Sequence, residues 1–133
     1  MWLNSLSDVQ RTALMRLAHN VVVSDGLLDP NEEGMLDEFR AEMELASSDV
    51  EYLELDGIEQ IFSDRRSKVI AILNLLKLSY ADGAFEIEEE CLLKEICSTL
   101  GIEDAEFLLL DNWVKRLTTL EQEARDLISK PVQ

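Results

Sequence analysis

Apolar residues recur at the spacing of an α-helix along almost the whole chain, and this pattern limits the folds open to it. No stretch alternates with a period of two for long enough to indicate a strand. Ser7 and Gln10 form a capping box that would open the first helix, whose apolar face reads Val9, Ala13, Leu14, Leu17, Ala18, Val21 and Val22. We therefore expect an all-α protein, a single compact bundle of about seven helices in one domain over residues 1–133.

Turn and capping residues divide the remaining chain into helices joined by short loops. Gly101 is expected to stop one of these helices, and Pro131 is expected to end the last one. After the first helix, further helices are expected to start at Pro30, at Ser48, near Gly57, near Asp64 and after an Asp82–Gly83 loop. The last two expected helices cover 104–110 and the stretch from Trp113.

The composition excludes several classes of function. The chain carries 28 acidic and 12 basic residues, a net charge of -16, which disfavours binding to nucleic acid or to anionic lipid. The same charge permits binding of cations or of basic protein surfaces. The N-terminus has no basic, apolar signal segment, and no apolar run approaches the ~18 residues of a membrane span, so we expect a cytoplasmic protein without direct membrane insertion.

The two cysteines fit a reducing compartment. Cys91 and Cys97 are six residues apart in one expected helix, so their Cα atoms would lie ~9 Å apart, too far for a disulfide. That spacing is also unlike a zinc motif. Both are expected to be reduced thiols in the core.

The sequence contains an apparent internal duplication. Shifting the chain by 57 places Ser24–Glu33 on Ala81–Glu90, and both segments read Asp-Gly, one residue, Leu or Phe, an acid, two residues and two glutamates. A second block, Asp49–Asp56, falls on Asp104–Asp111 at a shift of 55. We expect two three-helix repeats, at about 7–56 and 64–129, that pack around a pseudo-twofold axis.

Each repeat would carry an acidic loop between two helices. Oxygen ligands of this kind suit hard cations such as Ca²⁺ or Mg²⁺. The front half of an EF-hand is missing, because Val21 and Val23, or Leu78 and Tyr80, stand where its first ligands would be. The candidate ligands are Asp25, Asp29 and Glu32 in the first loop and Asp82, Glu86 and Glu89 in the second.

A purely structural interpretation of the same loops stays open. Asp29 can cap the second helix while Glu32 reaches back to its first amides, and Asp25 and Asp82 can bond the amides of their own turns. Capping needs one acid per loop, however, and each loop has at least three. Both interpretations remain at this point.

Catalytic signatures are absent from the sequence. His19 is the sole histidine and has no identifiable carboxylate partner, so a structural role on its helix, or a supporting ligand, is expected. No nucleophile elbow, Walker motif or dinucleotide glycine pattern occurs. We expect a protein that is not an enzyme and has no catalytic residues. A metal-dependent carboxylate hydrolase is the least favoured alternative, because helical sites of that kind usually add histidine ligands.

The stretch from Leu75 to Glu89, Leu-Leu-Lys-Leu-Ser-Tyr-Ala-Asp-Gly-Ala-Phe-Glu-Ile-Glu-Glu, followed by Leu100-Gly101-Ile102, resembles the signature of the TerB-like family. These are the tellurite-resistance protein B domains. The first loop matches more loosely, with Ser24 in place of alanine. The resemblance implies an internally duplicated helical fold, a non-enzymatic stress-related role, and an interest in Asp25, Glu32, Asp82 and Glu89.

Together these observations predict a cytoplasmic binding module of the tellurite-resistance type. It would hold a divalent cation weakly at its two acidic loops, or present their carboxylates to a protein partner with a basic surface. The alternative is a purely structural protein–protein adaptor or homodimer that has no metal.

Overall fold

The described chain is mostly helical and organised around one central helix. The computed structural model describes residues 1–22, 34, 57–80 and 87–129. These residues form a short 3₁₀ helix and five α-helices, and the described part of the chain contains no strand. The elements are η1 (Leu3–Ser5), α1 (Asp8–Val22), α3 (Ile58–Ile61), α4 (Arg65–Ser79), α5 (Ile87–Leu100) and α6 (Asp104–Ser129). The predicted all-α class is therefore confirmed for these residues.

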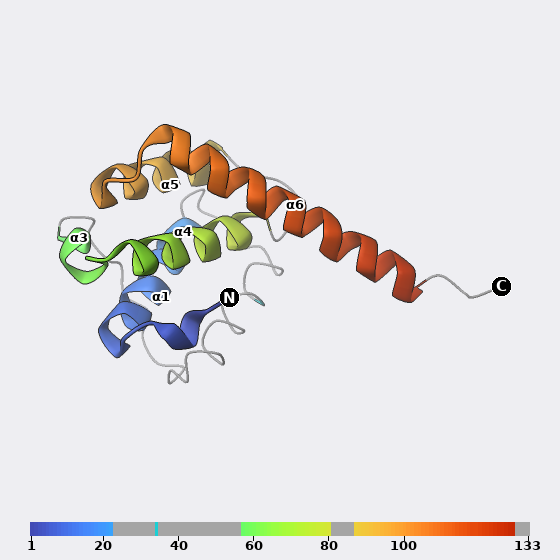
Figure 1. The fold of residues 1–133 in the computed structure, drawn as a ribbon, viewed down its shortest axis with the longest axis horizontal. Coiled ribbons are helices and arrows are strands. Elements are labelled where there is room, and N and C mark those ends of the chain that lie inside the picture. The colour runs from blue at the N-terminus through green and yellow to red at the C-terminus, as the bar shows by residue number, and fades with distance from the viewer. Residues whose placement is uncertain (23–33, 35–56, 81–86, 130–133) are drawn as a thin grey trace.

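Helix α4 lies between the other helices, with α1 on one side and α5 and α6 on the other (Figure 1). Its apolar residues are buried around most of its circumference, as expected of a helix covered by neighbours on several sides. The helix begins after Asp64, whose carboxylate accepts a 2.5 Å hydrogen bond from the Ser67 hydroxyl. That bond lowers the pKa of Asp64. The largest fully buried α4 side chains are Ile72, Leu75, Leu76 and Leu78.

Two predicted helix ends are confirmed in detail. The Ser7 amide donates to Gln10 Oε1 at 3.0 Å, and the Gln10 amide donates to Ser7 Oγ at 3.2 Å, which completes the capping box of α1. At the end of α5, Gly101 adopts a φ of 78°. Its amide donates to the Ser98 carbonyl, and the Ile102 amide donates to the Cys97 carbonyl at 2.8 Å, the bond pattern of a Schellman motif.

The expected number and division of helices needs correction. The break expected between a helix at 104–110 and a last helix from Trp113 is wrong, because α6 runs without interruption from Asp104 to Ser129. No glycine or proline lies within it, and Asp111 turns inward to bind Tyr80. The helices expected from Pro30 and Ser48 lie outside the described residues. Seven helices and a pseudo-twofold duplication are thus not supported by the described part of the chain.

The two thiols have different surroundings, so the expectation that both lie in the core is wrong for Cys91. Cys91 is exposed on α5, whereas Cys97 is buried at 3% exposure, and neither forms a disulfide. Burial, together with the nearby charges of Asp104 and Glu106, raises the pKa of the Cys97 thiol to about 12.

A thiol reagent added to the native protein is expected to modify Cys91 and spare Cys97, because only Cys91 is accessible and Cys97 stays protonated. Mass spectrometry should find one label per native chain and two after denaturation. The Cys91→Ser variant is the control and should take up no label while folded. Rapid labelling of that variant would contradict the buried position of Cys97.

The start of the chain is fastened to α4 by a buried amide. Asn74 is fully buried, and its Nδ2 donates to the carbonyls of Met1 at 2.9 Å and Ile70 at 2.8 Å. Its Oδ1 accepts a 3.0 Å hydrogen bond from the Met1 amino group. Leu3 and Leu6 then pack in the core, so this anchor also holds η1 in place.

Asn74→Ala is expected to lower the free energy of unfolding by about 1–3 kcal/mol, because it leaves polar groups of Met1 without their buried partner. Urea denaturation followed by circular dichroism measures the change. Asn112→Ala, at an exposed site on α6, is the matched control and should change stability by less than about 0.5 kcal/mol. Equal effects of the two substitutions would contradict the anchoring role.

Candidate functional site

One of the six predicted cation ligands lies in the described part of the chain. Glu89 lies near the described start of α5 and is 1% exposed, so its carboxylate is shielded from solvent. The other five candidates, Asp25, Asp29, Glu32, Asp82 and Glu86, lie outside the described residues, and their mutual geometry stays a prediction.

Tyr80, at the end of α4, is the last described residue before the second loop. The Tyr80 hydroxyl donates a 2.6 Å hydrogen bond to Asp111 Oδ1 on α6. Asp111 Oδ2 in turn forms an ion pair with Lys115 Nζ at 3.2 Å. Burial, the bond to Asp111 and the charges of Asp111 and Glu90 all raise the pKa of Tyr80. Helix α4 therefore ends at Tyr80 beside a network of acidic groups, and Glu89 lies two residues after the described start of α5.

Asp111 is the site residue that sequence reasoning missed. It was aligned only with Asp56 as part of a repeated block, without a role. The available signal was its position, four residues after Phe107 and three before Val114, on the buried face of α6. A carboxylate at such a position requires a polar partner, and Tyr80 and Lys115 supply it.

His19 remains apart from these groups. It lies half-buried in the last turn of α1. Among the residues that the structure describes, no three histidine, cysteine or acidic side chains converge in a way that could hold a metal ion. A complete site therefore requires ligands from the loops themselves.

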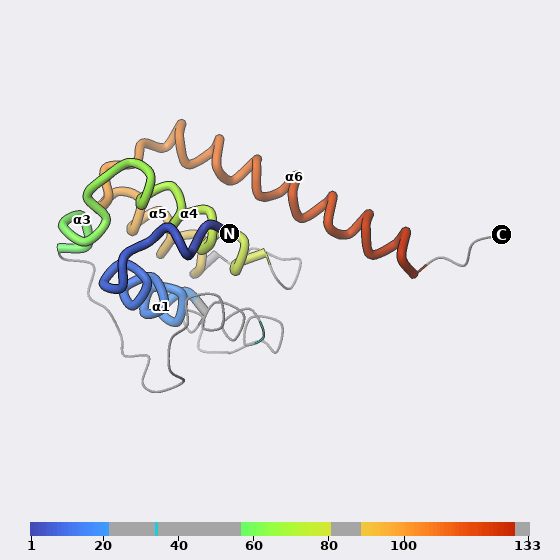
Figure 2. Tube along the Cα trace, turned by 60° about the horizontal axis from the view of Figure 1, so that its bottom comes forward, coloured from blue at the N-terminus to red at the C-terminus, as the bar shows by residue number. Residues whose placement is uncertain are grey.

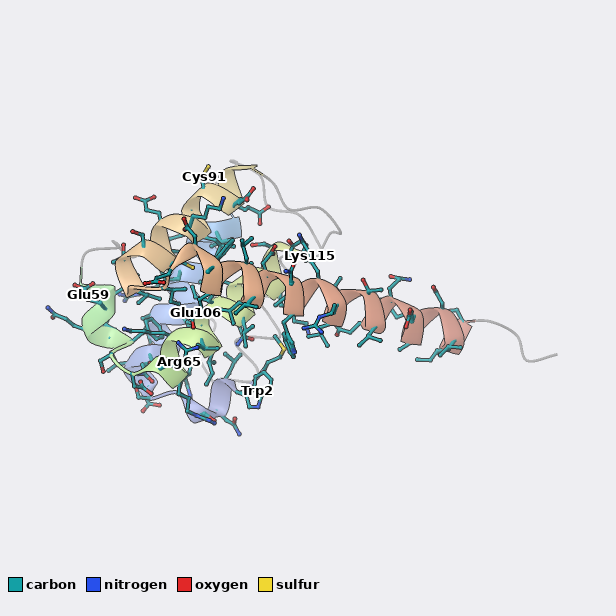
Figure 3. All side chains as sticks on the ribbon, turned by 45° about the horizontal axis from the view of Figure 1, so that its top comes forward. Trp2, Glu59, Arg65, Cys91, Glu106 and Lys115 are labelled. Carbon is teal, nitrogen blue, oxygen red and sulfur yellow. The ribbon has the colours of Figure 1, made fainter. Side chains whose placement is uncertain are left out.

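A second surface, around Trp2, is largely apolar, in contrast to the acidic loops. Trp2 is 49% exposed, and its ring lies 6.3 Å from that of Trp113 on α6. A surface pocket of about 440 Å³ beside Trp2 is lined by Arg65, Arg66, Val69, Ile70 and Leu73. Arg65 forms an ion pair with Glu106, and the two side chains meet between α4 and α6 (Figure 3). Trp2 is therefore partly exposed at the edge of this pocket.

Helix α6 continues past the bundle. Its first half packs on α4 and α5 through Phe107, Asp111 and Val114, and Lys77 of α4 pairs with Glu121 at 3.3 Å. Beyond that ion pair the helix projects away from the other elements (Figure 2). Leu127 and Ile128 are exposed there, at 75% and 84%, and Leu120, just before Glu121, is 60% exposed.

Comparison with known families agrees with the resemblance in the sequence. The family model of tellurite resistance protein TerB matches residues 56–112. We call this matched stretch, which is similar to the TerB family, the TerB segment. Comparison with curated proteins and with solved structures found no significant match. The TerB segment contains α3, α4, the second acidic loop, α5 and the packed start of α6, and it therefore includes Tyr80, Glu89 and Asp111. The first acidic loop and the projecting half of α6 lie outside it.

The described part of the TerB segment consists of helices and the short connections between them, and none of the described helices is long and apolar enough to cross a membrane. Its Asp82–Gly83 pair lies in the sequence between α4, which is capped by Tyr80, and α5. The buried network around Asp111 therefore belongs to the matched segment.

Tyr80→Phe is expected to lower the free energy of unfolding at pH 7 by about 1.5–3 kcal/mol, because Asp111 loses a hydrogen bond to its charged oxygen. The raised pKa of Tyr80 means that its stabilising effect is present below its unfolded pKa of about 10 and is lost as pH rises further. The difference in the free energy of unfolding between wild type and Tyr80→Phe should therefore become smaller above pH 10. Urea denaturation at pH 7 and above pH 10 measures both effects.

A double-mutant cycle with Asp111→Ala tests whether the two residues act together. The combined loss should be smaller than the sum of the single losses by about 1–3 kcal/mol, because either substitution removes the same bond. Additive losses would show that the two side chains do not interact in solution.

Proposed function

We propose that the protein is a non-enzymatic binding module of the tellurite-resistance type, which acts in a stress response by holding a divalent cation at its acidic loops. The match to TerB supports the family-level part of this proposal. The observation that supports the cation is Glu89, a carboxylate at 1% exposure near the described start of α5. Asp82 and Glu86 precede it at the spacing of oxygen ligands in a tight turn.

The charge around the second loop favours a cation over an anion. Asp111 and Glu90 lie close enough to Tyr80 for both of their negative charges to raise its pKa. Lys115 and Lys94 offset part of this charge through ion pairs of 3.2 and 3.3 Å with Asp111 and Glu90. A divalent ion at the loop would add to that compensation, and Ca²⁺ or Mg²⁺ suits oxygen ligands.

The first loop is proposed to act in the same way through Asp25, Asp29 and Glu32. Supporting this, α1 begins at Asp8 and α4 begins at Arg65, and these positions differ by the shift of 57 that aligns the two loops. Each loop would then follow an equivalent helix. Because neither loop has the front half of an EF-hand, binding is expected to be weak, with a dissociation constant of about 10⁻⁴–10⁻³ M.

Calorimetry with Ca²⁺ and Mg²⁺ tests the cation. Wild type should release or absorb measurable heat on binding, and the Asp25→Asn/Asp82→Asn variant should lose most of it, because each loop loses one charged ligand. Glu89→Gln should weaken the second site alone. Asp126→Asn removes the same charge from an exposed position on α6 and serves as the matched control. Absence of heat from wild type at millimolar cation would contradict the cation site.

A second function is proposed because a separate observation favours it. Exposed apolar side chains on α6 and at Trp2 suit a purely structural adaptor or homodimer, in which no metal takes part. In that case a chelator would leave the association unchanged. The cytoplasm is the proposed location, since the chain carries two free thiols.

A further inference from the structure

Six apolar residues of α6 follow the alternating three- and four-residue spacing of a coiled coil. We call them the α6 stripe: Leu110, Trp113, Leu117, Leu120, Ala124 and Leu127. On the helix surface this stripe lies beside the core face formed by Phe107, Asp111 and Val114. Leu110 and Trp113 at its start are partly buried against the core, whereas Leu120 and Leu127 are exposed. Three heptads of such spacing are typical of a helix that pairs with another helix.

The stripe has two halves with different surroundings. Its first half, up to Leu117, runs along the bundle, where Trp113 packs against the ring of Trp2. Its second half projects from the bundle, and Leu120 and Leu127 are 60% and 75% exposed (Figure 1). Because α6 is continuous, the projecting half cannot fold back onto the first half of its own stripe. A second copy of the chain can supply that contact.

We propose that two copies of this protein pair through antiparallel α6 helices, around a twofold axis that passes beside residues 118 and 119. This inference rests on the second function proposed above, the homodimer, and is independent of cation binding. Leu117 then faces Leu120 of the second copy, Trp113 faces Ala124, and Leu110 faces Leu127. A twofold interface makes each of these contacts twice.

Charge complementarity selects this register. The residues that flank the stripe include Arg116 and Glu123, both exposed, and the proposed pairing sets Arg116 of one copy beside Glu123 of the other. Moving the pairing by one heptad toward the C-terminus would instead set Glu123 beside Glu123 and Glu121 beside Glu121. Like charges at such flanking positions disfavour that arrangement. The proposed register therefore combines apolar layers with opposite charges.

Size-exclusion chromatography and sedimentation equilibrium of the full chain test the dimer. The net charge of -16 on each copy opposes association, so the measurements belong at about 0.15 M salt, where the Debye length is about 8 Å. Wild type should dimerise in the micromolar range, with or without a chelator. Leu120→Asp should weaken the dimer about a hundredfold, because the twofold axis places two charges in apolar layers.

Leu108→Asp is the matched control, since Leu108 is 57% exposed on the same helix but lies off the stripe. It should leave the dimer unchanged. Arg116→Glu should weaken the dimer about tenfold, and the Arg116→Glu/Glu123→Arg double variant should restore it by re-forming both flanking pairs with reversed sign. Circular dichroism checks that each variant folds.

The inference is overturned if wild type sediments as a monomer throughout the micromolar range, or if Leu108→Asp disrupts the dimer as strongly as Leu120→Asp. Failure of the double variant to recover would overturn the register. None of these results bears on the cation, which calorimetry tests separately, so the two proposals can fail independently.

Discussion

The burial of α4 is the constraint on which the rest of the structure depends. Its apolar side chains face α1 on one side and α5 and α6 on the other, so each of these helices is held by contact with it. Such burial also covers polar groups, and each finds a partner: Asn74 binds Met1, and Ser79 donates to the Leu75 carbonyl at 3.0 Å. The helix can therefore be enclosed without leaving these groups unsatisfied.

Helix boundaries were predictable where a local interaction sets them. The Ser7–Gln10 box and the Gly101 stop each involve residues within five positions of one another, so the sequence alone contains the whole interaction. Contacts between distant segments were not predictable. Asp111 lies at the expected break between the helix at 104–110 and the one from Trp113. Its hydrogen bond to Tyr80, 31 positions earlier, could not be predicted from the sequence around that break.

The same limit applies to the candidate site. The sequence pointed to acids at Asp82, Glu86 and Glu89, and the TerB match covers all three. The sequence alone could not predict the burial of Glu89 or the Tyr80–Asp111 hydrogen bond, because both depend on how α4, α5 and α6 pack together. Those contacts position Tyr80 and Glu89, which are described residues on either side of the second loop in the sequence.

Helix α6 contributes Asp111 to the candidate site and the α6 stripe to the proposed dimer interface. The interactions that stabilise this helix differ along its length. Up to Glu121 its residues are stabilised by packing and by the Lys77 ion pair, whereas the last turns lie exposed. An isolated helical end gains little from propensity alone, since most helical stability in proteins comes from tertiary packing of an apolar face. Pairing of two α6 stripes would supply that packing to both projecting ends at once. The apolar character of Leu120, Leu127 and Ile128 then has a physical explanation that a solitary chain does not provide.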